Sequence, residues 1–365
     1  MFKIKFVLPL AALAFLAFIL TSNRTPLEKD FKKLWAKVDS LSNLQQPRSA
    51  LEIVDEIYQL AKKEDNQPQI IKASLYRISL MAGFEEDHLP KAISQIQHEI
   101  GMAKTPEIQI LYSILAELYQ KYYQANAYNL LNRTRVENFD LEDINTWDAQ
   151  KILLEAKTCY LASLEAPDAL KKINVESFQA ILIEESGSKM FRPTLYDFLA
   201  HRAIDYLAND ENSVTVANKQ FVPDDVKFFA PFNAFINIKP DEKFAENSLW
   251  LALEIYQRLL GFHATDDSPQ ALIDADLSRL QLVHRKTSLD NKDSLYLSAL
   301  QDLNEKYASN PFSTQISFRL AELYNQQSGN YKALVSDDFR WEKKKAAEIC
   351  QLAIEKFPDT DGAKN

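Results

Sequence analysis

Glycine is scarce in this chain, and that scarcity narrows the folds open to it. Only six glycines occur in 365 residues, whereas average usage would give about four times as many. No two of them lie closer than 18 positions. This spacing excludes the dinucleotide-binding loop, the Walker A loop and the nucleophile elbow, each of which needs two nearby glycines. It also disfavours an all-β chain, whose tight turns use glycine.

Apolar residues recur with the period of an α-helix along most of the chain. The hydrophobic content of 46% is ordinary for a folded protein, and helix-forming residues dominate. The pattern predicts an all-α fold of helical hairpins resembling tetratricopeptide (TPR) repeats, stacked as an α–α superhelix. Pro47 and Ser49 should mark the start of the second helix, and Pro193 the first turn of a later one. Helices are expected near 34–41, 50–61, 70–80, 89–100, 107–124, 146–164, 193–207, 245–261, 270–286, 293–308, 313–327 and 338–357.

Residues 209–243 break the helical pattern. Ser213–Val216 alternates like a strand, and phenylalanines crowd the stretch that follows. We expect irregular structure at a domain junction, with these rings anchored in the protein's own core; an exposed aromatic surface is the alternative. The junction would separate a helical array over 23–208 from TPR-like repeats over 244–365. The phenylalanines are Phe221, Phe228, Phe229, Phe232 and Phe235.

Two short segments recur in the same order. Ala50–Ile53 returns as Ala252–Ile255, an offset of 202, and Leu115–Tyr119 returns as Leu320–Tyr324, an offset of 205. The near-equal offsets predict two related helical arrays, although helical sequences draw on few residue types and can match by chance. The second copy has the spacing of the first helix of a TPR-like hairpin. Small residues and a proline suit the second helix, at Ala346, Ala353 and Pro358.

The N-terminus has the pattern of an export signal. Lys3 and Lys5 precede an apolar run from Phe6 to Leu20, followed by small polar residues. A membrane span needs about 20 apolar residues, so a signal peptide over residues 1–22 is favoured over a retained anchor. The protein is therefore expected to be exported to the periplasm, the cell envelope or the outside. Only this segment should meet a membrane.

Charge disfavours one class of partner, and the cysteine count bears on disulfide bonding. The net charge is −9 and the longest basic run is Lys343–Lys345, which disfavours nucleic acid as a partner. Cys159 and Cys350 lie 191 positions apart. Two cysteines cannot form a disulfide framework, so two buried free thiols are favoured over a disulfide between them.

Catalytic and metal-binding patterns are not recognisable. His88 and His98 are ten apart, and Glu85–His88 suits a solvated loop or the charge at the start of a helix. Asp359–Gly362 resembles part of a calcium loop, but Phe357 stands where the first carboxylate would be needed. Paired carboxylates far apart in sequence stay open. We predict no catalytic, cofactor-binding or metal residues, no cofactor and no enzyme activity, and we predict packing roles for the tryptophans Trp35, Trp147 and Trp250.

An ordered set of segments resembles the N-terminal helical region of the large alpha-2-macroglobulin-like proteins of Bacteroidota. The resemblance runs from about residue 31 to at least 208. No segment is a catalytic motif, but the order of the set is distinctive. The segments are Trp35–Leu41, Pro47–Leu51, Gln69–Ala73, Leu115–Tyr119 with Tyr122 and Tyr123, Arg133 and Thr134, Thr146–Asp148 and Arg192–Leu199.

The resemblance implies an exported protein of the protease-inhibiting class, in which macroglobulin domains follow the helical region. The chain departs from that pattern because it stops at Asn365, within what looks like an unfinished repeat, and carries no Cys-Gly-Glu-Gln thioester. We therefore expect a fragment that serves as a scaffold or docking segment, with inhibition in the missing downstream domains. Its expected partners are proteins, either proteases or those downstream domains.

Two other functions stay open. One is a stand-alone TPR-like adaptor for protein–protein interaction in the bacterial envelope. The other is a glycan-capture helical outer-membrane protein, which would be expected to carry an N-terminal lipobox cysteine that this sequence does not have.

Overall fold

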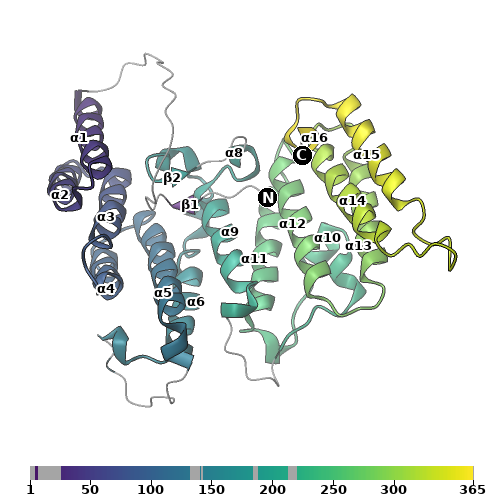
Figure 1. Ribbon diagram of the computed structural model, residues 1–365, viewed down its shortest axis with the longest axis horizontal. Coiled ribbons are helices and arrows are strands. Elements are labelled where there is room, and N and C mark those ends of the chain that lie inside the picture. The colour runs from purple at the N-terminus through teal and green to yellow at the C-terminus, as the bar shows by residue number, and fades with distance from the viewer. Residues whose placement is uncertain are drawn as a thin grey trace. The chain divides into compact units, whose positions relative to one another are not determined.

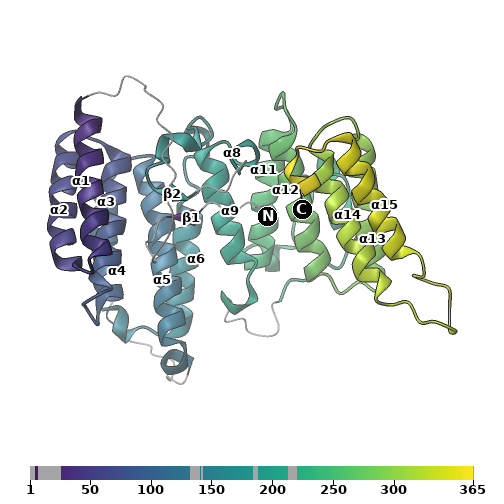
Figure 2. The same ribbon diagram turned by 45° about the horizontal axis from the view of Figure 1, so that its top comes forward.

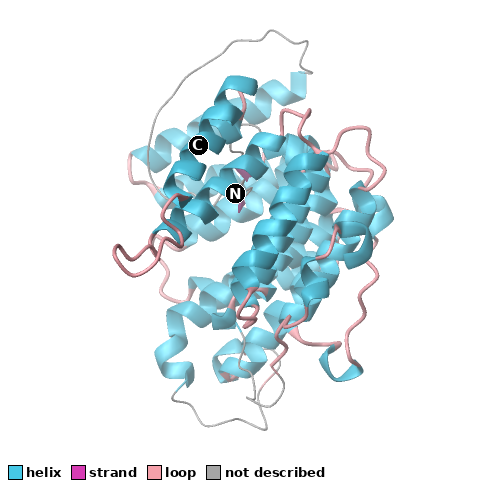
Figure 3. Ribbon diagram, turned by 90° about the vertical axis from the view of Figure 1, so that its right-hand side faces the viewer, coloured by secondary structure: helices cyan, strands magenta, loops and turns pink. Residues whose placement is uncertain are grey.

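The computed structural model describes residues 5–6, 26–131, 140, 143–183, 188–212 and 220–364. These residues form an all-α, repeat-like fold, as predicted (Figure 3). Two short strands, β1 (Lys5–Phe6) and β2 (Leu182–Ile183), pair antiparallel. Apart from Lys5 and Phe6, the predicted signal peptide lies outside the described residues, as does the strand-like Ser213–Val216.

The chain divides into two compact units, residues 1–214 and residues 215–365. Among the described residues, no helix is both long and apolar enough to span a bilayer. The first unit contains α1 (Pro26–Asn43), α2 (Pro47–Lys63), α3 (Gln67–Met81), α4 (His88–Ile100), α5 (Glu107–Leu131), α6 (Ala149–Ala162), α7 (Pro167–Leu170), α8 (Ser188–Phe191) and α9 (Leu195–Leu207), with 3-10 turns η1 (Ile144–Thr146), η2 (Val175–Phe178) and η3 (Asp210–Asn212) (Figure 1).

The described residues of the second unit begin with the phenylalanine-rich stretch and continue as five longer helices and one short one. It contains η5 (Val226–Phe229), α10 (Phe232–Phe235), η6 (Glu242–Phe244), α11 (Ser248–His263), α12 (Gln270–Lys286), α13 (Lys292–Lys306), α14 (Ser313–Ser328), α15 (Glu342–Lys356) and α16 (Asp361–Lys364) (Figure 1).

Helix ends differ from the predicted bounds where a cap decides them. Thr194 caps α9, because its hydroxyl accepts the Asp197 N–H while the Asp197 carboxylate accepts the Thr194 N–H. Pro193 therefore precedes the cap and is not in the first turn. The prediction for Ser49 was also wrong: α2 begins at Pro47, in the first helical position.

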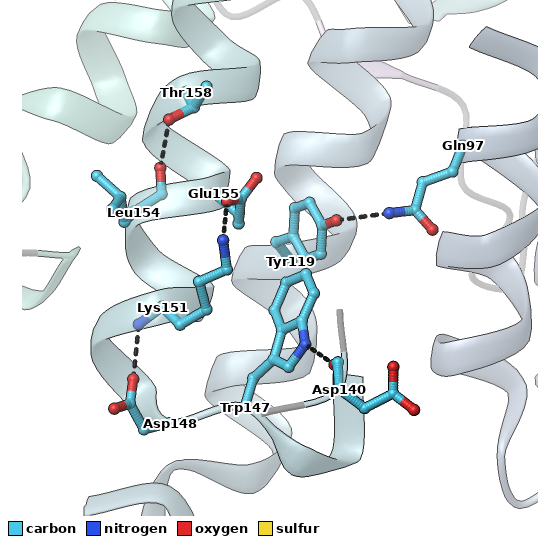
Figure 4. Close-up of polar contacts among 9 residues, drawn as sticks. All are labelled: Gln97, Tyr119, Asp140, Trp147, Asp148, Lys151, Leu154, Glu155 and Thr158. Atoms are coloured by element: carbon cyan, nitrogen blue, oxygen red, sulfur yellow. Dashed lines mark hydrogen bonds and ion pairs between the residues drawn. The ribbon is translucent and has the colours of Figure 1, made fainter. Parts of the chain in front are cut away.

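The units are built from corresponding helices in the same order. In each unit, successive helices from α2 to α6 and from α11 to α15 contact one another. The repeated pentapeptide lies in α5 and in α14. In α5 the Tyr119 hydroxyl accepts a hydrogen bond from Gln97 Nε2 at 3.0 Å, and in α14 the Tyr324 hydroxyl accepts one from Gln301 Nε2 at 3.2 Å. The donor stands on the preceding helix in both cases, which supports two related arrays. Figure 4 shows the bond between Gln97 and Tyr119.

Three tryptophans pack between helices, as predicted. Trp35, Trp147 and Trp250 are buried. Trp147 stacks on Tyr119 with ring centroids 5.7 Å apart, and its indole N–H donates to the Asp140 carbonyl at 2.7 Å (Figure 4). These contacts join α5 to the start of α6.

The phenylalanine-rich stretch is anchored in the second unit. Four of its five phenylalanines are buried, and Phe232 is half-buried. The ring of Phe221 meets Trp250 edge-on at 5.6 Å, so the stretch packs against α11. Anchoring in the core, rather than exposure as an aromatic surface, is therefore the role of most of these rings.

Both cysteines are free thiols. Cys159 is buried, and burial followed by the charge of Glu155 raises the pKa of its thiol to about 12, which makes it unreactive. The prediction of burial is wrong for Cys350, which is exposed on α15. Its exposure follows from the uncovered state of that helix, described next.

Candidate functional site

Exposed apolar side chains gather near the C-terminal end of the second unit. Of the fifteen large hydrophobic side chains exposed among the described residues, seven lie between Tyr331 and Ile354. Single exposed hydrophobic residues are normal, but a cluster marks an interaction surface. We call these seven the C-terminal apolar surface: Tyr331, Leu334, Val335, Phe339, Trp341, Leu352 and Ile354.

This surface has two parts. Five of its residues stand in the loop that leads from α14 into α15, which extends away from the helices beside it (Figure 2). Leu352 and Ile354 stand on α15 itself, where Leu352 is 65% exposed. Ala346 is the one buried residue of α15. A helix with so little buried surface contributes weakly to folding, so its apolar residues need another explanation.

The first unit shows what covers the corresponding face. There α9 packs on both α5 and α6. The Tyr206 hydroxyl of α9 donates to the Leu153 carbonyl at 2.8 Å, and the Tyr206 ring lies 4.8 Å from that of Tyr160. On α5, Arg202 of α9 donates to the Glu117 carboxylate at 2.7 Å. The α5–α6 hairpin is thus covered by a helix with an aromatic tip and one cation.

The same positions in α14 and α15 are uncovered. Ala149, Ile152, Ala156 and Tyr160 of α6 correspond in spacing to Ala346, Ile349, Ala353 and Phe357 of the second unit. Leu153 then corresponds to Cys350, and Glu117 corresponds to Glu322. Leu153 is buried, whereas Cys350 and Glu322 are exposed. The face that α9 covers in the first unit is therefore open in the second.

The four-residue helix α16 packs against the start of α14. This helix contacts both α14 and α15. A Cβ on its Gly362 would lie 2.5 Å from the Thr314 carbonyl carbon and 2.6 Å from the Gln315 nitrogen. Only glycine permits so close an approach between two helix backbones. The segment Asp359–Gly362, which resembled part of a calcium loop, thus turns the chain onto α14.

A groove of about 430 Å³ opens beside α15, and two of its lining residues differ from their counterparts in the first unit. It lies between the C-terminal half of α15, the end of α13 and the start of α14, with Ser317 and Leu352 in its lining. By the offset of the repeated pentapeptide, Ser317 corresponds to Tyr112 of α5. A small residue therefore stands in place of a large one. Leu352 corresponds to Glu155, so an apolar side chain lines the groove where the first unit has a carboxylate.

Two of the buried carboxylates of the first unit, Glu99 and Glu107, lie only eight positions apart, so they are not the pair distant in sequence that stayed open above. Glu99 accepts a hydrogen bond from the Tyr58 hydroxyl and lies 3.6 Å from Lys62 Nζ. Burial, and then the charge of Glu99, raises the pKa of Glu107 above its ordinary value. Both side chains are more than nine-tenths buried, so a substrate could not reach them. They join α2, α4 and α5 as a polar contact within the core.

The acidic segment Glu85–His88 leads into α4, in agreement with the expected loop or helix start. Asp87 precedes α4 as its N-cap residue, and Lys91 pairs with Glu85 at 2.5 Å. Among the residues that the structure describes, no three His, Cys, Asp or Glu side chains converge closely enough to hold a metal ion.

Comparisons with protein-family models, with curated proteins and with solved structures each give no match for this chain.

The sequence prediction missed the C-terminal apolar surface. Phe339 and Trp341 near the start of α15 were a usable signal, because two aromatic residues in a charged loop need a partner. Trp341 is 58% exposed, unlike the three buried tryptophans. Helical periodicity could not reveal this difference, since it tells which face of α15 is apolar and not whether a helix covers it.

Proposed function

We propose that this chain is a helical docking scaffold of an exported alpha-2-macroglobulin-like protease inhibitor. One observation carries the proposal: the α14–α15 face is open and apolar where the corresponding α5–α6 face is covered by α9. Helical arrays bind other proteins through extended surfaces of this kind. The resemblance over residues 31–208 supplies the inhibitor class, and inhibition itself would belong to other domains of that protein.

The docked segment is an amphipathic helix with the chemistry of α9. In the first unit, α9 presents apolar residues together with Arg202, which pairs with Glu117. Glu322 is the counterpart of Glu117 and is exposed, with Arg319 beside it on the same helix. A partner helix with a Lys or Arg facing Glu322 and apolar residues facing Cys350 and Ile354 would therefore reproduce the first unit's packing.

A stand-alone adaptor of the envelope is the second candidate, and the same open face supports it. The two candidates differ only in the partner. For the inhibitor, the docked helix belongs to a polypeptide with macroglobulin domains. For the adaptor, it belongs to an unrelated envelope protein.

Site-specific photo-crosslinking tests both. A benzoylphenylalanine replaces Cys350 in the producing cell, and a matched variant carries it at Leu154, an exposed residue of α6. We expect a protein adduct from position 350 alone, weakened by Ile354→Glu, with a helical segment identified by mass spectrometry. Equal yields from both positions, or an adduct that survives Ile354→Glu unchanged, would contradict docking at this face.

A second experiment tests where inhibition resides. The purified chain is incubated with a panel of endopeptidases, and residual protease activity is measured. We expect no stoichiometric inhibition and no covalent capture, because trapping a protease needs a cleavable segment coupled to a large rearrangement. Stoichiometric inhibition would show that these residues carry the activity and would overturn the scaffold assignment.

A further inference from the structure

A small pocket lies between the phenylalanine-rich stretch and two helices of the second unit. Its volume is about 100 Å³. One wall comes from η5 and α10, and the other from α12 and α13. The walls are largely apolar, and they include Phe229, Phe232, Leu280, Ala299, Leu303 and Tyr307. No residue of the C-terminal apolar surface lines this pocket.

The floor of this pocket is a buried ion pair. Arg279 is fully buried, and its Nη1 donates to the Phe228 carbonyl at 2.7 Å and the Ala230 carbonyl at 3.2 Å. Its Nε donates to Asp276 Oδ1 at 3.0 Å, and its Nη2 donates to the same oxygen. The guanidinium also lies 4.5 Å from the Phe235 ring centroid. Arg279 therefore holds the stretch against α12 and fixes Asp276.

The second carboxylate oxygen of Asp276 is available. Both bonds from Arg279 to Asp276 reach Oδ1, and among the described residues we find no hydrogen bond to Oδ2. Asp276 is only 3% exposed, and it lines the pocket. Oδ2 therefore meets solvent through the pocket, and a ligand that offers an N–H or O–H here would take the place of water as its donor.

The charges around the pocket favour a neutral ligand. Asp276 is balanced by Arg279, and Asp302 and Lys306 line the mouth with opposite signs. A cationic ligand would meet Arg279 and Lys306, and an anionic one would meet Asp276 and Asp302. Lys306 Nζ lies 4.8 Å from the Phe232 ring centroid and 5.0 Å from that of Tyr307. An aromatic ring entering here would join that cation–π cluster.

We propose that this pocket binds a neutral aromatic ring carrying one hydrogen-bond donor, of the phenol class, with the hydroxyl donating to Asp276 Oδ2. A cavity of about 150 Å³ holds a benzene ring completely. The smaller pocket takes the hydroxyl-bearing end of the ring, while the rest of the ring stays in contact with Phe232 at the mouth. A tyrosine side chain of a peptide and a free phenol share this chemistry.

Ligand-observed NMR with p-cresol tests the site on the purified chain. The matched probe is 4-methylanisole, in which a methyl group replaces the donated hydrogen. We expect p-cresol to bind at least tenfold more tightly, because a site built to bond a hydroxyl rejects the analogue without it. Equal affinities, or no p-cresol binding up to its solubility limit, would overturn the proposal.

A pair of leucine variants places the binding. Ala299→Leu fills the pocket from α13, and Ser298→Leu adds the same side chain to the exposed neighbouring position. Circular dichroism checks that both variants fold. We expect Ala299→Leu to abolish p-cresol binding and Ser298→Leu to leave it unchanged. Binding that persists in folded Ala299→Leu would mean that p-cresol sits elsewhere, and the proposal would be wrong.

The source of the ring is decided with N-acetyl-tyrosine amide and its phenylalanine counterpart. If a peptide tyrosine is the natural ligand, the tyrosine amide binds at least as tightly as p-cresol and the phenylalanine amide at least tenfold more weakly. If the tyrosine amide binds tenfold more weakly than p-cresol, the ligand is a free phenol. A tyrosine amide and a phenylalanine amide of equal affinity would contradict the bond to Asp276 altogether.

Discussion

The same five residues, Leu-Ala-Glu-Leu-Tyr, stand in α5 and in α14, and the two copies differ in what lies around them. Both tyrosines accept a hydrogen bond from a glutamine of the preceding helix. The two glutamates differ: Glu117 is bound by Arg202 of another helix, whereas Glu322 is bound by Arg319 of its own. The hydrogen bond on the inner face is therefore the same in both units. The outer face depends on whether a covering helix is present.

The largest expected difference concerns two tryptophans that precede corresponding helices. Trp147 before α6 is buried, and Trp341 before α15 is exposed. Trp147→Ala should destabilise the protein by about 3–5 kcal/mol, because a large cavity is left. Trp341→Ala should stay within about 0.5 kcal/mol. Urea unfolding followed by circular dichroism measures both. Similar losses for the two variants would mean that the faces are equally covered and would break the comparison.

The inner faces were predictable from sequence because they follow a period. Ala50, Val54, Ile57 and Ala61 of α2 are spaced one helical turn apart, and all are buried. The polar side-chain contacts inside each unit were not predictable. Arg202 and Ser113 are 89 positions apart, and Arg279 donates to carbonyls of residues about fifty positions earlier. Backbone carbonyls are identical at every position, so such bonds leave no trace in the sequence.

The candidate surface was only partly predictable for a related reason. The apolar positions of α15 can be read from the sequence, but their exposure depends on a helix that corresponds to α9. The buried pocket at Asp276 was also hidden, since its walls come from η5 and α13, which are far apart along the chain. Phe229 was correctly expected to anchor the stretch, whereas Phe232 is half-buried, and the part of both in a pocket required the fold.

Removing Arg202 should have the second largest effect. Its Nε donates to Ser113 Oγ at 2.8 Å, and its Nη2 donates to Glu117 at 2.7 Å. Arg202→Met removes one of the two cations that pair with this half-buried carboxylate, the other being Lys121 at 2.9 Å, so about 1–3 kcal/mol should be lost at pH 7. In the second unit, Arg319→Met removes the ion pair with the exposed Glu322, and the protein should lose less than about 1 kcal/mol of stability.

The pH dependence of that loss identifies Glu117 as its source. Burial raises the pKa of Glu117, but the charges and hydrogen bonds of Arg202 and Lys121 outweigh burial and hold it below its ordinary value of 4.5. A carboxyl whose pKa is lowered by folding stabilises the protein above its unfolded pKa and loses that effect as the pH falls through the folded one. The difference between wild type and Arg202→Met should therefore shrink below about pH 4. A difference that is constant from pH 7 to pH 3 would exclude Glu117.

The smallest expected effect tests whether the two arrays are truly equivalent. Tyr119→Phe and Tyr324→Phe each remove one hydroxyl that accepts a bond from a glutamine on the preceding helix. Because both glutamines are exposed and can bond to solvent instead, each variant should lose only about 0.5–1 kcal/mol. Double-mutant cycles with Gln97→Met and Gln301→Met measure the coupling by urea unfolding, and equivalent arrays should give coupling energies that agree within about 0.5 kcal/mol. Coupling at one tyrosine and none at the other would show that the pentapeptides match by helical composition alone, and the assignment of α9 as the template for the missing cover would fall with it.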